Sequence, residues 1–114
     1  MNLLIIINRR ADDGTDVAWN ASRLANKACE MGSTVRVFLL NDGVWNAHKS
    51  FGVAEIEAHA LLKQAVARGV ALRACGTCIE RARIDPKDML PEATVSVLPD
   101  LVTWIEESDR VVSF

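Results

Sequence analysis

The sequence has 114 residues, enough for one domain with a single hydrophobic core, so we expect one domain over residues 1–114. Half of the residues are apolar and a quarter are charged, as in ordinary soluble globular proteins. The formal net charge is −2 and no basic block occurs, which argues against nucleic acid as a partner.

The chain opens with an apolar run from Leu3 to Ile7, typical of a strand that is covered on both faces of a parallel sheet. This run is too short to span a membrane. It also lacks the basic segment and the small-residue cleavage site of a signal peptide. We therefore expect a cytoplasmic protein that has no membrane partner.

A first helix is predicted over residues 17–31, because Gly32 provides the usual helix end. Trp19 falls on its polar face beside Asn26, either as a partly exposed aromatic residue or as a contact between subunits. The positions at helical spacing that we expect to face inward are Val17, Ala21, Leu24, Ala25, Ala28 and Met31.

The second strand is predicted near residues 34–40, and Asn41-Asp42-Gly43 follows it as a turn. Residues 44–51 show no period, and we interpret them as a loop long enough to overhang a site. A second helix extends over residues 58–66 and is stopped by Gly69, with His59 expected at the surface or in an interface.

The third strand, residues 70–74, leads directly into Cys75-Gly76-Thr77-Cys78, and a short helix candidate follows over residues 79–82. A strand that ends in a glycine turn and opens a helix directs backbone N–H groups at one spot, where a thiol is biased toward thiolate. We expect the N–H groups of Gly76, Thr77 and Cys78 to stabilise that thiolate, with positive potential from Arg73, Arg81 and Arg83.

A fourth strand near residues 93–98 and a fifth near 109–114 flank a helix that opens at Pro99-Asp100. Leu101, Ile105 and Trp104 are expected to face inward from this helix. The alternating order predicts a three-layer α/β/α sandwich with a five-stranded parallel sheet. Reactive groups gather at the carboxyl ends of such strands, which is where the cysteine turn falls.

The cysteine pair is open to several interpretations. Two small buried apolar residues would explain it without chemistry. Zinc would require a second Cys/His pair that the sequence lacks, and Cys29 is best explained as a packing residue, so no metal is expected in one subunit. A thioredoxin-type redox pair keeps the chemistry but belongs to a mixed sheet. No glycine-rich phosphate loop occurs, and we expect no cofactor.

At Cys75-Gly76-Thr77-Cys78 the sequence resembles the DsrE/DsrF-like family of sulfur-relay proteins. The segments that match are the opening apolar strand, Asn41-Asp42-Gly43-Val44, residues 69–75 and the closing residues 109–114. The resemblance implies a five-stranded parallel sheet between helices and assembly as a trimer or hexamer. It also implies sulfur donor and acceptor proteins as partners, with sulfur carried as a persulfide at the position of Cys75.

One departure affects the end of the short helix. The family commonly has an Arg-Gly pair where this chain has Ala82-Arg83, and a left-handed helix end suits glycine better than arginine. Arg81 or Arg83 would then replace the family's arginine near an anion.

Our leading hypothesis is that Cys75 accepts sulfane sulfur and that Cys78 resolves the persulfide. We expect Cys75 to be the more reactive thiol, facing the loop crevice, and the Cys78 sulfur to be partly covered. The alternatives are a dithiol redox protein and a non-catalytic oligomeric module that binds a partner.

Overall fold

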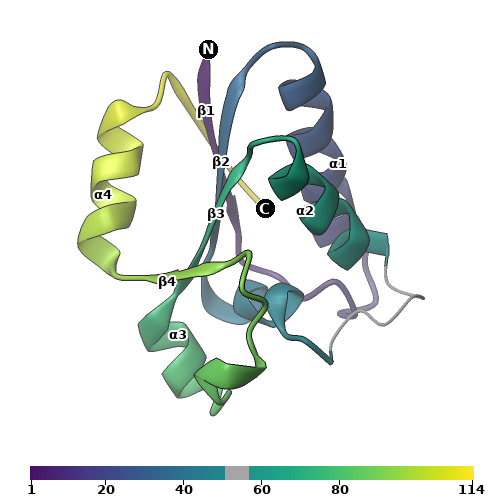
Figure 1. The fold of residues 1–114 in the computed structure, drawn as a ribbon, viewed down its shortest axis with the longest axis vertical. Coiled ribbons are helices and arrows are strands. Elements are labelled where there is room, and N and C mark those ends of the chain that lie inside the picture. The colour runs from purple at the N-terminus through teal and green to yellow at the C-terminus, as the bar shows by residue number, and fades with distance from the viewer. Residues whose placement is uncertain (51–56) are drawn as a thin grey trace.

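The computed structural model describes residues 1–50 and 57–114 (Figure 1). Five parallel strands form one sheet in the order β4-β3-β2-β1-β5. The elements in chain order are β1 (Asn2–Ile7), α1 (Val17–Glu30), β2 (Thr34–Leu39), the 3-10 helix η1 (Asn41–Ala47), α2 (Glu57–Ala67), β3 (Ala71–Cys75), α3 (Gly76–Arg81), the 3-10 helix η2 (Pro86–Asp88), β4 (Thr94–Ser96), α4 (Leu98–Glu107) and β5 (Arg110–Ser113).

The predicted α/β/α sandwich is confirmed. Helices α1 and α2 cover one face of the sheet and α4 covers the other (Figure 1). β1 and β2 lie in the middle, where both faces are covered, and for this reason β1 has a continuous apolar run over residues 3–7 and β2 is apolar apart from Thr34 and Arg36. The edge strands β4 and β5 are shorter than predicted, with three and four residues. On α4, Ile105 is 42% exposed, and the expectation that it faces inward is wrong.

The inward face of α1 is rotated from the predicted one. Leu24 is 38% exposed and Met31 is 79% exposed, whereas Asn26 is buried. Small residues at 18, 21, 22 and 25 let α1 approach α2 closely, so packing rather than hydropathy selects the buried face. The Asn26 amide is satisfied there, because it donates to the backbone oxygens of Ser22 and Leu61 at 3.0 and 2.9 Å.

The segment after β2 is not the loop that the sequence suggested, because residues 41–47 form η1. The backbone of Gly43 packs against the end of β1 so closely that a Cβ atom would lie 1.9 Å from the Ile7 carbonyl oxygen. Val44 and Ala47 are fully buried in the same helix. The last residue of the predicted loop, Phe51, lies outside the described residues.

His59 is buried on α2, with 7% of its surface exposed, and the expectation of a surface or interface histidine is wrong. Its Nε2 atom has no hydrogen-bond partner among the described residues. Burial holds the pKa of His59 below its usual range, and nearby Lys63 acts in the same direction, whereas the Glu92 carboxylate acts against both. His59 is therefore neutral in the fold at neutral pH.

Candidate functional site

The two motif cysteines lie at the carboxyl end of β3, where the strand turns into α3. Cys75 is the last residue of β3 and the N-cap of α3, and its Sγ atom accepts a hydrogen bond from the Cys78 backbone N–H at 3.2 Å. We had expected the backbone N–H groups of Gly76, Thr77 and Cys78 to surround this sulfur. In the described structure the hydrogen bond to it comes from the Cys78 N–H group. The turn thus ties the second cysteine's backbone to the first cysteine's sulfur.

Cys78 is held from a different strand. Its Sγ atom accepts a hydrogen bond from the backbone N–H of Asn41, which follows β2, at 3.3 Å. Asn41 has a φ of 52°, in the left-handed region that asparagine tolerates better than most residues. Its side-chain amide donates to the Asn8 Oδ1 atom at 2.9 Å, and Asn8 in turn donates to the Phe114 carbonyl at 3.1 Å. This network links the carboxyl ends of β1, β2, β3 and β5.

The predicted partial covering of the Cys78 sulfur is confirmed, but the expectation that Cys75 is the more accessible thiol is wrong. Cys75 is buried, with 6% of its surface exposed, whereas Cys78 is half-buried. The β3–α3 turn buries Cys75, because its sulfur caps the helix and points back toward the Cys78 amide. All three cysteines are free thiols, and Cys29 lies elsewhere, with its Sγ 3.6 Å from the Arg68 carbonyl oxygen.

The surroundings of Cys78 favour the neutral thiol. Burial raises the pKa of Cys78, and the neighbouring Cys75 side chain raises it further, while the Asn41 N–H group and Arg81 act in the opposite direction. The expected bias toward thiolate therefore does not hold for Cys78. A reagent that reacts with its thiolate will find a small ionised fraction at neutral pH.

The three arginines of this region differ in their positions. Arg81 is exposed at the end of α3 and close enough to act on the Cys78 pKa. Arg73 does not lie beside the thiols as expected, because its guanidinium stacks on the Trp104 ring at 4.3 Å, under α4. It also lies 4.0 Å from Asp100.

Arg83 adopts the left-handed conformation that the sequence had placed in doubt, with a φ of 58°. The hydrogen bonds around it are those of a Schellman helix end: the Arg83 N–H donates to the Glu80 carbonyl at 3.0 Å and the Ile84 N–H to the Ile79 carbonyl at 3.1 Å. Ile79 and Ile84 are both buried, which supplies the apolar contact that accompanies this motif.

Gly76 lets the turn pack closely against β4, and Thr77 lies on the surface. A Cβ atom on Gly76 would lie 3.2 Å from both the Ser96 oxygen and Val95 Cγ1 of β4, so the turn packs tightly against that strand. Thr77 is exposed at the start of α3. A cavity of about 610 Å³ lies beside this turn, lined by Gly76, Ile79, Glu80, Arg83, Ile84, Asp85, Pro86 and Val95.

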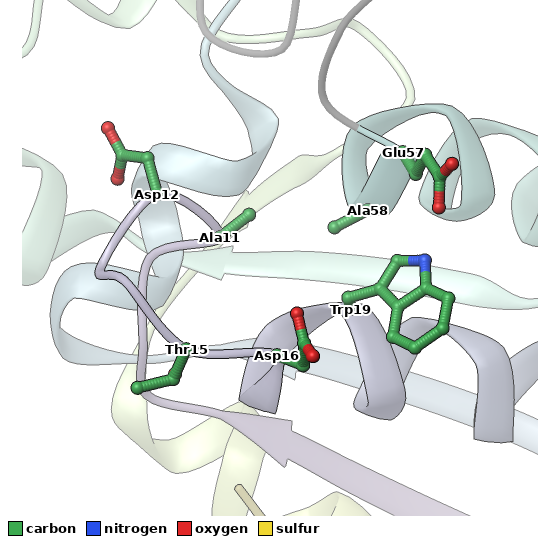
Figure 2. A pocket seen from close by; sticks show the side chains of 7 residues that line it. All are labelled: Ala11, Asp12, Thr15, Asp16, Trp19, Glu57 and Ala58. Carbon is green, nitrogen blue, oxygen red and sulfur yellow. The ribbon is translucent and has the colours of Figure 1, made fainter.

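A second cavity, of about 330 Å³, opens between the β1–α1 loop and the start of α2 (Figure 2). Trp19, Asp12, Asp16 and Glu57 are among its lining residues, and none of the lining residues belongs to the cysteine turn. The Arg23 guanidinium lies over the Trp19 ring, 4.5 Å from its centroid, so this residue is partly covered within the subunit.

No cluster of three or more His, Cys, Asp or Glu side chains suited to a metal ion occurs among residues 1–50 and 57–114. None of the helices in the described part of the chain is long and apolar enough to cross a membrane. The site presents two neighbouring free thiols at the end of a parallel strand.

Fold and site together define an α/β sandwich that presents a dithiol turn at the carboxyl edge of its sheet. The chain belongs to the DsrE/DsrF-like family, which it matches over residues 1–114. An uncharacterised protein of Methanocaldococcus jannaschii is 33% identical over the full length of both chains. Another from Methanopyrus kandleri is 30% identical, over 100% of this chain and 95% of that protein. The crystal structure of the E. coli ychN protein covers both chains fully, with a TM-score of 0.86 and 24% identity, which demonstrates the shared fold.

Sequence reasoning missed Asn41 as a contributor to the site. The signal available was its position directly after an apolar strand, on the same edge of the sheet as the cysteine turn. The local sequence did not predict the left-handed backbone of Asn41, which directs its N–H group at Cys78.

Proposed function

We propose that this protein carries sulfane sulfur as a cysteine persulfide on the Cys75–Cys78 pair, as part of a sulfur relay. The observation that carries the proposal is the arrangement of the thiols, each of which accepts a backbone N–H hydrogen bond at the carboxyl end of β3. Such donors stabilise negative charge on sulfur, which a thiolate and a persulfide anion both develop. Membership of a family associated with sulfur relay supports the same conclusion.

The proposed loading step is a thiol exchange. A cysteine thiolate of this chain attacks the outer sulfur of a donor protein's persulfide, the donor's S–S bond breaks, and the donor leaves as a thiolate. If Cys75 is loaded, the Cys78 thiolate can attack the Cys75 Sγ atom, release hydrosulfide and leave a Cys75–Cys78 disulfide. A dithiol reductant then restores both thiols.

Our proposal keeps Cys75 as the carrier residue and adds Cys78 as the thiol that a donor meets first, because Cys78 is the more exposed of the two. Arg81 and Arg83, both exposed around α3, are proposed to attract an anionic donor segment. The reaction needs free thiols, which a reducing compartment such as the cytoplasm maintains. We also propose a homo-oligomer, trimer or hexamer, as the working form.

The test is incubation of the reduced protein with a low-molecular-weight persulfide, followed by removal of the reagent and intact mass measurement. We expect a gain of one sulfur, about 32 Da, that dithiothreitol reverses. Cys75→Ser and Cys78→Ser, compared with Cys29→Ser as the matched control, identify the carrier. No gain of sulfur on Cys78→Ser, in which no second thiol of the pair can resolve a persulfide on Cys75, would refute the proposal.

A dithiol redox role is the second candidate, because Cys75 and Cys78 already lie within one turn, joined by a hydrogen bond. That role predicts an intramolecular disulfide, a loss of about 2 Da, on mild oxidation, and no persulfide adduct. The mass of Cys78→Ser after persulfide treatment therefore separates the two, because a persulfide on Cys75 cannot be resolved to the Cys75–Cys78 disulfide in that variant. A protein in which neither thiol reacts while folded would instead be a non-catalytic module that binds a partner.

A further inference from the structure

An asparagine side chain joins three segments of the chain at the carboxyl edge of the sheet. Asn8 follows β1 directly, and its side-chain oxygen accepts a hydrogen bond from the Asn41 Nδ2 atom at 2.9 Å. Its own Nδ2 atom donates to the Phe114 carbonyl oxygen at 3.1 Å and to the Ser113 hydroxyl oxygen at 3.3 Å. Because a carbonyl oxygen can only accept, one orientation of the Asn8 amide satisfies these partners. The Asn8 side chain is thus fixed by the end of β5 and holds the turn that follows β2.

The turn that Asn8 holds contains an unusual backbone conformation. Asn41 has a φ of 52°, which few residues other than glycine and asparagine adopt, and it lies exposed at the start of η1. The same turn has a second anchor, since the Leu40 N–H group donates to the Ile7 carbonyl oxygen at 2.9 Å. The backbone anchor keeps the turn on the end of β1, and the bond to Asn8 restrains residue 41 itself.

The backbone N–H group of Asn41 is directed at the second thiol of the motif. It donates to the Cys78 Sγ atom at 3.3 Å. A hydrogen bond to a charged acceptor is roughly twice as strong as one to a neutral acceptor, so this donor favours the thiolate. Burial and the Cys75 side chain raise the pKa of Cys78, whereas the Asn41 N–H group and Arg81 lower it. The ionisable groups that act on Cys78 are therefore Cys75 of β3 and Arg81 of α3, and Asn8 has no charge with which to act directly.

We propose that Asn8 is a positioning residue for Cys78, because its side-chain oxygen holds Asn41 so that the Asn41 N–H group stays directed at the Cys78 sulfur. Asn8 acts through a neighbour, since its side-chain hydrogen bonds go to residues 41, 113 and 114. The inference rests on the proposed function, in which the Cys78 thiolate attacks the outer sulfur of a donor persulfide, the donor's S–S bond breaks and the donor leaves as a thiolate. A larger thiolate fraction at Cys78 speeds that attack at neutral pH.

The pH dependence of Cys78 alkylation by iodoacetamide, from about pH 6 to pH 10, tests this role. The Cys75→Ser chain is the background, so that one thiol of the pair titrates, and peptide mass spectrometry measures Cys78 separately from Cys29. Asn8→Ala should raise the pH midpoint of alkylation by about one unit. At pH 8 the rate should fall about threefold, because a tenfold smaller thiolate fraction is partly offset by the greater nucleophilicity of a more basic thiolate. A merely structural role has the opposite sign, since a loosened turn would expose the sulfur, lower the midpoint and accelerate alkylation.

A double-mutant cycle shows whether Asn8 acts through Asn41. Asn41→Gly keeps the left-handed backbone and its N–H group but removes the side chain that Asn8 holds. We expect this variant to raise the midpoint as well. The chain that carries both Asn8→Ala and Asn41→Gly should shift no further than the larger of the two single shifts. Additive shifts would show that Asn8 acts by another route, and the proposal would then be wrong.

Asn2→Ala is the matched control, because Asn2 is a residue of the same type at the other end of β1. Its midpoint should equal that of the Cys75→Ser background. An unchanged or lowered midpoint in Asn8→Ala, or an equal rise in Asn2→Ala, would overturn the proposal. Circular dichroism checks folding, and Asn8→Ser, which also lacks the amide, takes the place of Asn8→Ala if that variant does not fold. Persulfide loading of Cys78→Ser, measured separately, decides the proposed function, whereas the alkylation midpoint decides the role of Asn8.

Discussion

Replacement of Arg83 by glycine should stabilise the protein, although it removes a charged side chain next to the candidate site. Arg83 has a φ of 58°, and a non-glycine residue in that region costs about 1–2 kcal/mol. Glycine adopts the same conformation without this cost but loses about 0.5–1 kcal/mol through its more flexible unfolded chain. The balance is a gain of about 1 kcal/mol in the free energy of unfolding, or about 4 °C in Tm.

The Arg83 backbone would keep its role in that variant. The Schellman hydrogen bonds from residues 83 and 84 involve N–H groups that glycine also has, and the Ile79–Ile84 contact is untouched. Arg81→Gly is a close control, because it removes the same charge two residues earlier. Residue 81 is the last residue of α3 and keeps a helical backbone, where glycine lowers the stability by about 0.5–1 kcal/mol.

Urea unfolding at one fixed protein concentration measures both variants, so that association contributes equally to each. Arg83→Gly should shift the midpoint up and Arg81→Gly should shift it down. If both variants lose stability by similar amounts, the left-handed backbone strain at Arg83 is smaller than the stabilisation from its side chain, and the reasoning is refuted.

Three further predictions concern the rest of the core and the thiols. Gly43→Ala should cost about 3 kcal/mol or more, or prevent folding, because the new Cβ would lie 1.9 Å from the Ile7 carbonyl oxygen; near-native stability in urea would contradict that packing. The pKa of His59 is lowered in the fold, so His59 takes up a proton more readily in the unfolded chain. The free energy of unfolding should therefore be highest above pH 6.5, the ordinary pKa of histidine, and should fall as the pH drops below that value. In His59→Gln the free energy of unfolding should depend less on pH below 6.5. If the pH dependence is unchanged in that variant, other groups cause it. Alkylation of Cys78 should accelerate as the pH passes above 9, since its pKa is raised, and Cys75→Ser should move the curve to lower pH; a rate already maximal at pH 7 would be incompatible with the structure.

The order of the elements and the place of the thiols were predictable from local sequence patterns. The continuous apolar run of β1 and the mainly apolar sequence of β2 indicate strands buried between two layers, and amphipathic helices between such strands favour a parallel sheet. Because Cys75 follows the third run directly, the carboxyl end of β3 was predictable as the position of the dithiol turn. These features depend on local periodicity, which a single sequence contains.

Which sulfur is covered, and what surrounds it, depends on the packing of distant elements. The Asn41 N–H group that contacts Cys78 is 37 positions away in the chain, so it depends on how η1 packs beneath β1 and β2. Arg73 was expected near the thiols because it is close to them in sequence. Side chains alternate between the two faces along β3, and the Arg73 side chain lies on the α4 face, over Trp104. Side-chain exposure is set by contacts between elements distant in sequence. Local patterns consequently located the dithiol turn, but they gave neither the contact from Asn41 nor the accessibility of the two thiols.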